Sequence, residues 1–245
     1  MTIDVMSGFI QPQWPAPASV KAFSSLRQSG VGEDPAVPLD DRDVMLLQQA
    51  LQIPATPIWL KQIHGNIAIQ ASPENSQQEG DALFTDKPNT VCVIRTADCI
   101  PIFFTTKTGS HIAAIHAGWR GLASGIIDAT LQKLPVAPAE ILAWLGPGIG
   151  PERFEVRKDV YDIFTLNDPG AEPAFNKISD EQWLADLFML ARQRLQKLGI
   201  TQIFGGDYCT YSDPEHFFSY RRDGKLTGRI LSLIWIEDLK NTKVV

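Results

Sequence analysis

Short apolar runs separated by turn residues dominate the middle of the chain. Four of them lie between residues 57 and 117: "PIWLKQI", "TVCVIRT", "IPIFFTT" and "HIAAIHA". Such runs, rich in β-branched and aromatic residues, are typical of strands in a sheet that is covered on both faces. Two later runs, "ILAWLGPGIG" and "TQIFGGD", have the same character and end in glycine-containing turns. The pattern therefore predicts six strands.

Other segments carry the apolar spacing of helices. The clearest is residues 181–198, "EQWLADLFMLARQRLQKL", whose apolar positions form one stripe. Asp180 can cap this helix, and Gly199 can end it. Residues 121–134, "GLASGIIDATLQKL", show helical spacing too, and shorter helices are predicted at "RDVMLLQQAL" and "VRKDVYDIF".

The two ends of the chain differ from this central pattern. Residues 1–56 are rich in proline, glycine and acidic residues, and we expect mostly loop there apart from the helix at "RDVMLLQQAL". Near the C-terminus, "FFSYRR" and "GRILSLIWI" flank "DGKLT" and predict a hairpin. Strands mixed with helices, without an internal repeat, indicate one α-and-β domain over residues 1–245.

Composition narrows the class of protein. With 44% hydrophobic and 20% charged residues, the chain has the composition of a soluble globular protein. Its net charge of −6 argues against a general nucleic-acid or membrane surface, so small molecules or other proteins are the expected partners. The N-terminus has no basic or apolar signal region, and no stretch reaches the roughly 18 apolar residues of a membrane span. We therefore expect a cytoplasmic protein. Because no helix is obviously exposed and apolar, we also expect a monomer.

Three residues with useful chemistry stand where predicted strands end beside turns. They are His64 in "LKQIHGN", Cys99 in "TADCIPI" and His116 in "AAIHAGW". Alternation along the strand directs His116 towards the interior. Two imidazoles and one thiolate suit Zn²⁺, and three protein ligands leave a fourth position open, which is typical of a catalytic site. Their separations are too long for a local motif, so only the fold can bring them together.

Less specific interpretations of the same residues stay open. A histidine at a strand end is more often a hydrogen-bonded core residue, and a buried cysteine is usually a small hydrophobe. A structural zinc in a non-catalytic binding module would need a fourth ligand, such as Cys92, Cys209 or Asp98. Cys92 is the weakest of these, because its odd offset from Cys99 along a strand faces the wrong way.

The sequence resembles the YfiH-like family. In order along residues 56–236, the segments that carry the resemblance are "WLKQIHGN", "GDALFT", "RTADCIPI", "AAIHAGWRGL", "AWLGPGIGP", "FEV", "GGDYCTY" and "FFSYRRDGKLTGR". The family is often labelled a multicopper polyphenol oxidase or laccase domain. Its members are regarded as purine nucleoside phosphorylases, acting on adenosine, inosine or S-methylthioadenosine, that can also deaminate adenosine.

The resemblance implies a fold, a metal site and a point of divergence. It implies a single α+β domain with mixed β-sheets layered between helices, and it places His64, Cys99 and His116 on the family's zinc ligands. Residues 1–56 diverge: "SSLRQSGVG" matches the family's S-T-R-x-G-G-V pattern only through Arg27, and "EDPAVPLDDRD" replaces a stretch like S-L-N-L-G-x-H-x-G-D. Substrate contacts that the family makes from that stretch are therefore not expected here.

The implied reactions assign roles to further residues. For deamination, a zinc ion lowers the pKa of water from about 15.7 towards 7. Asp98 is the candidate for moving protons, with a structural role as the alternative. Phosphorolysis needs a cationic clamp for the phosphate co-substrate, for which Arg120 and Arg27 are the candidates; a surface ion pair or helix cap is the alternative for Arg120.

Two further activities can be weighed from the residues. A laccase needs four coppers held mainly by histidine, and this chain has only four histidines, so copper oxidation is expected to be adventitious metal chemistry at the open site. Without a metal, Cys99 could act as a thiolate nucleophile, with His116 or His64 as its base, in a cysteine hydrolase that cleaves an amide.

Overall fold

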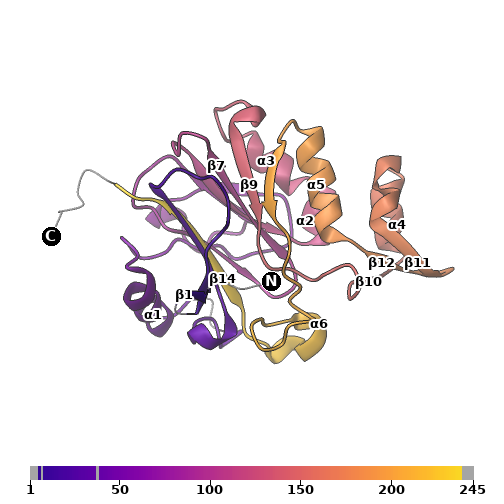
Figure 1. Ribbon diagram of the computed structural model, residues 1–245, viewed down its shortest axis with the longest axis horizontal. Coiled ribbons are helices and arrows are strands. Elements are labelled where there is room, and N and C mark those ends of the chain that lie inside the picture. The colour runs from indigo at the N-terminus through magenta and orange to yellow at the C-terminus, as the bar shows by residue number, and fades with distance from the viewer. Residues whose placement is uncertain (1–4, 7, 37–38, 239–245) are drawn as a thin grey trace.

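The computed structural model describes residues 5–6, 8–36 and 39–238, and their strands form three sheets. Two sheets pack face to face with helices outside them, in the order helix, sheet, sheet, helix. Figure 1 shows α1 on one side of the molecule and α2, α3 and α5 on the other, with β14 and β9 between them. The α+β architecture with layered mixed sheets is therefore confirmed.

The six-stranded sheet supplies most of the predicted strands. Its order is β13-β9-β7-β8-β5-β4, with parallel pairs at both edges and antiparallel pairs inside. The strands are β4 (Ala68–Gln70), β5 (Ala82–Thr85), β7 (Ile100–Thr106), β8 (Ile112–Ala117), β9 (Ile141–Leu145) and β13 (Gln202–Gly205).

The second large sheet joins strands from distant parts of the chain. Its order is β1-β2-β3-β14-β6, where the strands are β1 (Val5–Met6), β2 (Phe9–Ile10), β3 (Val20–Ser25), β6 (Cys92–Thr96) and β14 (Ile230–Ile236). A small antiparallel sheet follows the order β10-β12-β11, made of β10 (Glu155–Arg157), β11 (Phe175–Ser179) and β12 (Gln182–Ala185).

Helices cover the outer faces of these sheets. The α-helices are α1 (Asp41–Leu51), α2 (Trp119–Ser124), α3 (Ile126–Leu131), α4 (Lys158–Thr165), α5 (Leu187–Lys197) and α6 (Tyr220–Asp223). Short 3₁₀ helices occur at Arg27–Ser29, Pro73–Asn75, Pro138–Glu140, Pro169–Ala174 and Gly224–Leu226. None of the helices in the described ranges is both long and apolar enough to cross a bilayer.

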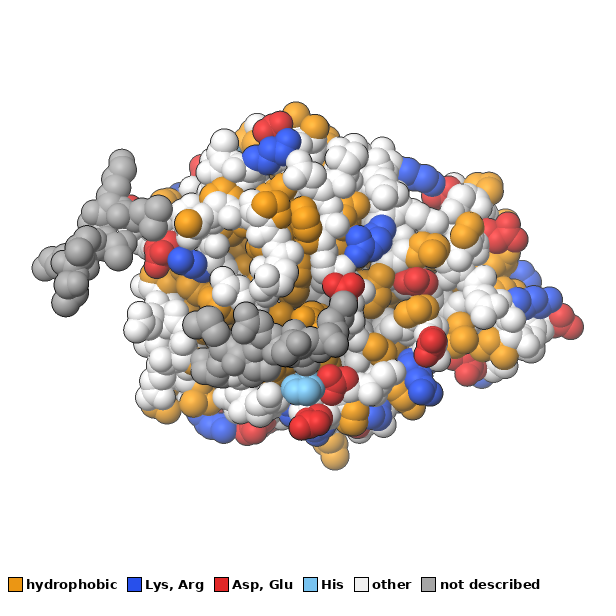
Figure 2. Space-filling view, viewed as in Figure 1, with side chains coloured by type: hydrophobic (Ala, Val, Ile, Leu, Met, Phe, Trp, Pro, Cys, Tyr) orange, Lys and Arg blue, Asp and Glu red, His pale blue; other side chains and the backbone are white. Residues whose placement is uncertain are grey.

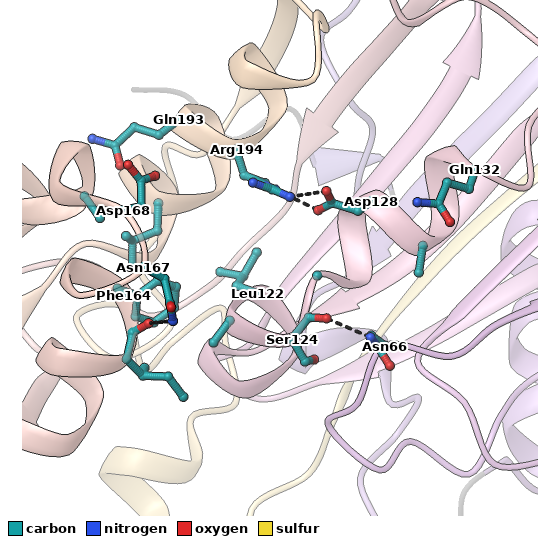
Figure 3. Close-up of a pocket in the computed structure, with 16 residues that line it drawn as sticks. Asn66, Leu122, Ser124, Asp128, Gln132, Phe164, Asn167, Asp168, Gln193 and Arg194 are labelled. Atoms are coloured by element: carbon teal, nitrogen blue, oxygen red, sulfur yellow. Dashed lines mark hydrogen bonds and ion pairs between the residues drawn. The ribbon is translucent and has the colours of Figure 1, made fainter.

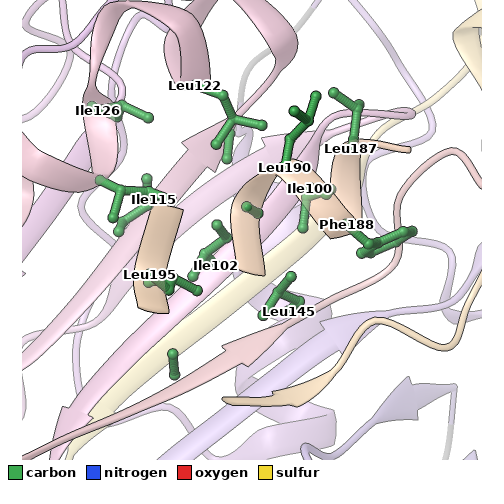
Figure 4. Packing of buried hydrophobic residues seen from close by; sticks show 14 of the residues in the cluster. Ile100, Ile102, Ile115, Leu122, Ile126, Leu145, Leu187, Phe188, Leu190 and Leu195 are labelled. Carbon is green, nitrogen blue, oxygen red and sulfur yellow. The ribbon is translucent and has the colours of Figure 1, made fainter. Parts of the chain in front are cut away.

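Strand alternation divides the core into layers. Along β7, Ile102 and Phe104 belong to the same buried cluster as Ile126 of α3 and Leu190 of α5. Figure 4 shows Ile102 within this cluster. Phe103, between Ile102 and Phe104, faces the other large sheet and stacks on Trp144 with ring centroids 5.4 Å apart. Because both faces of β7 are covered, the whole strand is apolar or weakly polar and buried.

Two predicted elements at the C-terminal half are wrong in part. Residues 182–185 form β12, which pairs with β10 and β11, instead of the first turn of a helix; Trp183 on this strand stacks on Tyr161 of α4 with ring centroids 4.5 Å apart. The helix begins at Leu187, where the carboxylate of Asp186, and not Asp180, accepts a hydrogen bond from the backbone N–H of Met189. The segment "FFSYRR" is not a strand either, since the hydroxyl of Ser219 caps the short helix α6.

Three other expectations also need correction. Residues 121–134 are interrupted at Gly125, whose φ of 86° ends α2 and starts α3. The "PIWLKQI" run forms isolated bridges, such as that from Ile58 to Cys92, instead of a strand. Farther along this run, the side chain of Gln62, in place of its backbone, bonds to the backbone of Arg95. Within residues 1–56, β3 was expected to be loop, yet it pairs with β14 at the centre of a sheet.

Candidate active site

His64, Cys99 and His116 converge at the end of the six-stranded sheet. Their ligand atoms all lie within 4.8 Å of one another, and the two imidazole centroids are 4.7 Å apart in an edge-on arrangement. Cys99 directly precedes β7, and His116 on β8 pairs with Pro101 on β7. The antiparallel register of β7 and β8 therefore brings together a thiol and an imidazole that the sequence separates.

His64 reaches the group from a loop with an unusual backbone conformation. Its φ of 59° lies in the left-handed region, which residues with a side chain rarely adopt. Gln62 fastens this segment beside β6, because its side-chain amide donates to the carbonyl of Arg95 at 2.7 Å and accepts from the N–H of Arg95 at 2.8 Å. The segment just before His64 is thus held against β6 by the Gln62 side chain.

Asp81 is the second anchor and the residue that organises the group. One carboxylate oxygen accepts hydrogen bonds from the His64 N–H at 2.9 Å and from Nδ1 of His116 at 2.8 Å, and the other accepts from the Gly65 N–H at 2.6 Å. The Asp81 side chain is fully buried. Because Nδ1 of His116 is bound to this carboxylate, its Nε2 is the atom left for a ligand.

The electrostatics of the group favour a thiolate. Burial alone would raise the pKa of Cys99, but the imidazoles of His116 and His64 outweigh it and lower the pKa to about 6. Burial would lower the pKa of His116, but Cys99 and Asp81 raise it to about 9. Burial would raise the pKa of Asp81, yet hydrogen bonds from His116 and two backbone N–H groups lower it below its usual value. Before a metal binds, Cys99 and His116 therefore form a thiolate–imidazolium pair.

The three donors fit a borderline-soft divalent metal such as zinc. Two imidazole nitrogens and one thiolate are ligands that Zn²⁺ prefers, and Asp81 provides the outer carboxylate that commonly orients a metal-binding histidine. Among the described residues, the group that could hold a metal consists of His64, Cys99 and His116. The possible fourth ligands, Cys92, Cys209 and Asp98, lie outside this group. An open fourth position is thus favoured over a closed structural site.

Gly118 gives the thiol the space that it needs. A Cβ on this residue would lie 2.7 Å from Sγ of Cys99 and 3.4 Å from Cδ2 of His64. The backbone of Gly118 therefore packs against one side of the group so closely that the Cβ of any other residue would overlap with Cys99.

The group opens into a cavity of about 720 Å³. Asp98 and Arg120 line this cavity beside the three donors, together with the aromatic side chains of Trp59, Trp119, Phe154 and Tyr220. Arg27 does not line it. That arginine lies in a separate hollow, where it donates to the carbonyl of Pro214 at 3.1 Å and sits over the ring of Phe218.

The side chains of Asp98 and Arg120 are already engaged. Asp98 has a φ of 95°, and its two carboxylate oxygens accept hydrogen bonds from the Thr210 hydroxyl and the Arg221 N–H, each at 2.7 Å. These bonds tie the strand end before Cys99 to residues 210–221. Arg120 is exposed at the start of α2, with its guanidinium 4.3 Å from the ring centroid of Trp119.

A second cavity, of about 500 Å³, lies between α3, α4 and α5. Its polar groups have partners: Arg194 binds the carboxylate of Asp128, and Asn66 donates to the carbonyl of Ser124 at 2.7 Å (Figure 3). Asp168, which also lines the cavity, forms an ion pair with Lys197. None of the predicted site residues lines it. On the face shown in Figure 2, acidic and basic side chains are interspersed, without a continuous basic patch.

Comparison with known proteins identifies the family. The model for the family described as multi-copper polyphenol oxidoreductase laccase matches residues 18–237. The chain belongs to this family. A purine nucleoside phosphorylase, YfiH, of Escherichia coli is 43% identical over 244 residues, which cover 94% of this chain and 100% of the relative. A purine nucleoside phosphorylase of Haemophilus influenzae is 42% identical over 242 residues, covering 93% and 99%.

Solved structures of the family agree with the fold. The crystal structure of the Neisseria meningitidis protein NMB0706 superposes with a TM-score of 0.87 at 38% identity, covering 94% of this chain and 100% of that one. The resemblance to YfiH-like proteins predicted from the sequence is thereby confirmed.

Sequence reasoning missed several residues that build the site. Asp81 accepts hydrogen bonds from the backbone of the turn at His64 and Gly65, and it also orients His116. Arg95 and Arg229 also line the cavity and were not singled out. The available signal was their position: Arg95 lies just before "TADC", and Arg229 ends "LTGR".

Proposed function

We propose that this protein is a zinc-dependent purine nucleoside phosphorylase that also deaminates adenosine. The observation that carries the proposal is the open group of His64, Cys99 and His116 at the base of a cavity with aromatic and cationic walls. The relatives named purine nucleoside phosphorylase, which align over nearly the whole chain, support the substrate class.

The protein's own residues would hold the metal and shape its surroundings. His64, Cys99 and His116 supply the donors, while Asp81 fixes the tautomer of His116 and the loop that carries His64. When bound there, zinc supplies Lewis-acid chemistry for attack by water in the deaminase reaction. The aromatic side chains of the cavity provide apolar surfaces against which a purine can stack.

Asp98 has a positioning role in this proposal. Both of its carboxylate oxygens accept hydrogen bonds from residues 210–221, and its backbone carbonyl accepts from the Ile149 N–H at 2.8 Å. A proton shuttle would have to exchange protons with substrate, whereas these contacts commit Asp98 to holding the strand end in a rare conformation. We therefore assign Asp98 to the alignment of Cys99.

A cysteine hydrolase that cleaves an amide is the second candidate. The observation in its favour is the Cys99 pKa of about 6 beside the cationic His116, which is the arrangement of an activated thiolate nucleophile. This reaction would need no metal. Multicopper oxidation fits less well, because His111 and His216 lie outside the three-ligand group and bond to Ser110 and Asp213.

The test is product analysis with defined metal content. Protein stripped with chelator and reloaded with zinc is incubated with adenosine or inosine, with and without phosphate. We expect free base and ribose 1-phosphate only when phosphate is present, and inosine from adenosine without it. Activity of the stripped protein on amides, lost on alkylation of Cys99, would instead establish the hydrolase. A zinc-loaded protein inactive on every nucleoside would refute the proposal.

A further inference from the structure

Tyr220 places an exposed aromatic ring at the cavity that contains the three metal donors. Its side chain lines this cavity together with Cys99 and His116, and the residue is 46% exposed. A single exposed aromatic residue is ordinary on a protein surface, so its surroundings have to show whether it has a role. Three features of those surroundings point to a ligand.

The first feature is a fixed backbone on the C-terminal and N-terminal sides of Tyr220. The fully buried Ser219 caps α6, and its hydroxyl accepts a hydrogen bond from the Arg222 N–H at 3.3 Å. The Arg221 N–H donates to a carboxylate oxygen of Asp98 at 2.7 Å. A tyrosine has only two side-chain torsions, and on an anchored backbone it loses little freedom when a ligand covers its ring.

Two arginine side chains extend this support. The guanidinium of Arg221 donates to the carbonyl of Glu155 at 3.1 and 3.2 Å. The guanidinium of Arg222 donates to three backbone carbonyls between residues 210 and 217, at 2.7, 2.8 and 3.0 Å. The short helix α6 is therefore tied to two neighbouring segments, and Tyr220 stands on a firm base although its ring is exposed.

The second feature is a direct connection to the metal donors. Asp98 immediately precedes Cys99, and its two carboxylate oxygens bind the Arg221 N–H and the Thr210 hydroxyl, each at 2.7 Å. The residue next to Tyr220 is thus bonded to the residue next to Cys99. A flat ligand lying on the Tyr220 ring would therefore keep a constant position relative to the metal donors.

The charge of the Tyr220 hydroxyl reaches the cavity wall as well. Burial lowers the pKa of Arg229, and the charge of Tyr220 is the largest of those that raise it. Arg229 lines the same cavity. Charges act on one another in this way only over short distances, so the hydroxyl end of Tyr220 lies on the cavity side of the ring.

The third feature appears on comparison with the other rings of the cavity, which already have neighbours. The guanidinium of Arg120 lies 4.3 Å from the ring centroid of Trp119, and that of Arg221 lies 5.3 Å from the ring centroid of Phe154. Trp59 packs against the buried apolar cluster beneath α1. Each of these rings is therefore partly used by the packing of the protein itself.

The ring of Tyr220 has no such neighbour. In the part of the chain that the structure describes, neither another aromatic ring nor a cation is stacked on it. A flat aromatic ligand can therefore lie on this ring without displacing a protein group. A purine base suits it, because every base has a π-face that stacks on aromatic side chains.

We propose that Tyr220 stacks on the purine base of the bound nucleoside. This inference rests on the proposed function, and it makes Tyr220 a substrate-binding residue for that reaction. Stacking uses the faces of the base and not the groups at its edge. Tyr220 therefore supports adenosine and inosine equally, and it favours purines over the smaller pyrimidines, which offer less area to the ring.

The test compares Tyr220→Phe, Tyr220→Leu and Tyr220→Ala with the control Leu226→Ala, all zinc-loaded. Leu226 is 88% exposed, follows α6 closely and does not line this cavity. Two quantities are measured: the KM for inosine and for adenosine at saturating phosphate, and the dissociation constant of free hypoxanthine by calorimetry. Zinc content and the KM for phosphate are measured alongside.

The variants are expected to separate the flat ring from mere apolar bulk. Tyr220→Ala and Tyr220→Leu should raise the KM for both nucleosides and the dissociation constant of hypoxanthine by about 10-fold. Tyr220→Phe keeps the ring and should stay within about threefold of the wild type. Zinc content and the KM for phosphate should not change, and Leu226→Ala should match the wild type throughout.

The outcomes separate this inference from the proposed function. If Tyr220→Leu binds hypoxanthine as the wild type does, or if Tyr220→Phe loses as much as Tyr220→Ala, stacking on Tyr220 is wrong. A rise in the KM for phosphate alone would contradict it too. If the wild type cleaves no nucleoside, the proposed function fails, while calorimetry with hypoxanthine still decides whether Tyr220 binds a purine. A wild type that binds no hypoxanthine would overturn this inference.

Discussion

The two cavities of this protein differ in their ionisable side chains. The cavity beside the six-stranded sheet is lined by Arg95, Arg120, Arg221 and Arg229 and holds a thiolate beside two imidazoles. In the cavity between α3, α4 and α5, Asp128 and Arg194 neutralise each other. Titratable groups that shift one another's pKa values inside a cavity are typical of functional sites, whereas an ion pair such as Asp128–Arg194 stabilises packing. The comparison favours the cavity beside the six-stranded sheet as the place of the reaction.

The largest expected effect follows removal of the thiolate. Cys99→Ala deletes one metal donor, and we expect loss of bound zinc and a fall in nucleoside cleavage of more than about 100-fold, since loss of an outer partner alone costs 10–100-fold. Metal analysis and kinetics measure both. Cys209→Ala, which alters a partly buried cysteine outside the group, should keep zinc and activity. Equal losses of zinc and activity in Cys99→Ala and Cys209→Ala would contradict a specific role of Cys99 as a metal donor.

Asp81→Asn should weaken the metal site without removing a donor. The amide can no longer accept hydrogen bonds at both oxygens, so both the His116 tautomer and the His64 loop lose support. We expect zinc affinity to fall by about 10–100-fold. Competition with a chromophoric chelator measures this affinity. An unchanged affinity would show that the buried carboxylate serves folding alone.

Gly118→Ala tests the close approach to the thiol. The added methyl group would meet Sγ of Cys99 at 2.7 Å, and relieving this overlap costs about 1–3 kcal/mol. We expect about a tenfold lower zinc affinity, measured by the same competition. If the methyl group is accommodated, affinity will stay at the wild-type level and the tight packing described here is incorrect.

The thiolate of the zinc-free protein should be visible in its pH dependence. Because the pKa of Cys99 is lowered to about 6, its thiolate fraction rises about tenfold between pH 5 and 7. Alkylation by iodoacetamide, corrected with Cys99→Ala protein, should follow this curve and level off above neutrality. A midpoint near the ordinary thiol value of about 8.5 would contradict the thiolate–imidazolium pair.

The smallest effect is expected in the second cavity. Asp128→Asn breaks the ion pair with Arg194, whose side chain is 45% exposed, so screening by solvent limits the loss of stability to about 1 kcal/mol or less. Zinc affinity and catalysis should not change. Denaturant unfolding and the same assays measure these quantities. A large loss of activity would mean that both cavities take part in the reaction.

Local patterns predicted the central sheet well, and they singled out three side chains that the fold brings together. Runs such as "IPIFFTT" are apolar on both faces because both faces of β7 are covered, and His116 and Cys99 stand at strand ends that the pattern marks. The layered α+β fold and the YfiH-like relationship were likewise predicted correctly.

Elements that depend on distant partners could not be predicted in this way. β3 is a central strand only because β14 pairs with it, and β12 is a strand only because β10 and β11 pair with it. Likewise, Asp81 becomes an organiser of the group only where β5 lies beside β8, and Arg95 meets Arg229 only through the pairing of β6 with β14. Register across a sheet is information that spacing along the chain does not contain.

The central claim is that phosphate is the nucleophile in the first cavity, and an isotope experiment tests it most directly. Zinc-loaded wild-type protein is incubated with inosine and phosphate whose oxygens are all ¹⁸O, and the sugar product is analysed by mass spectrometry. We predict ribose 1-phosphate that retains every labelled oxygen, together with free hypoxanthine. Unlabelled free ribose as the product would show attack by water and contradict the claim.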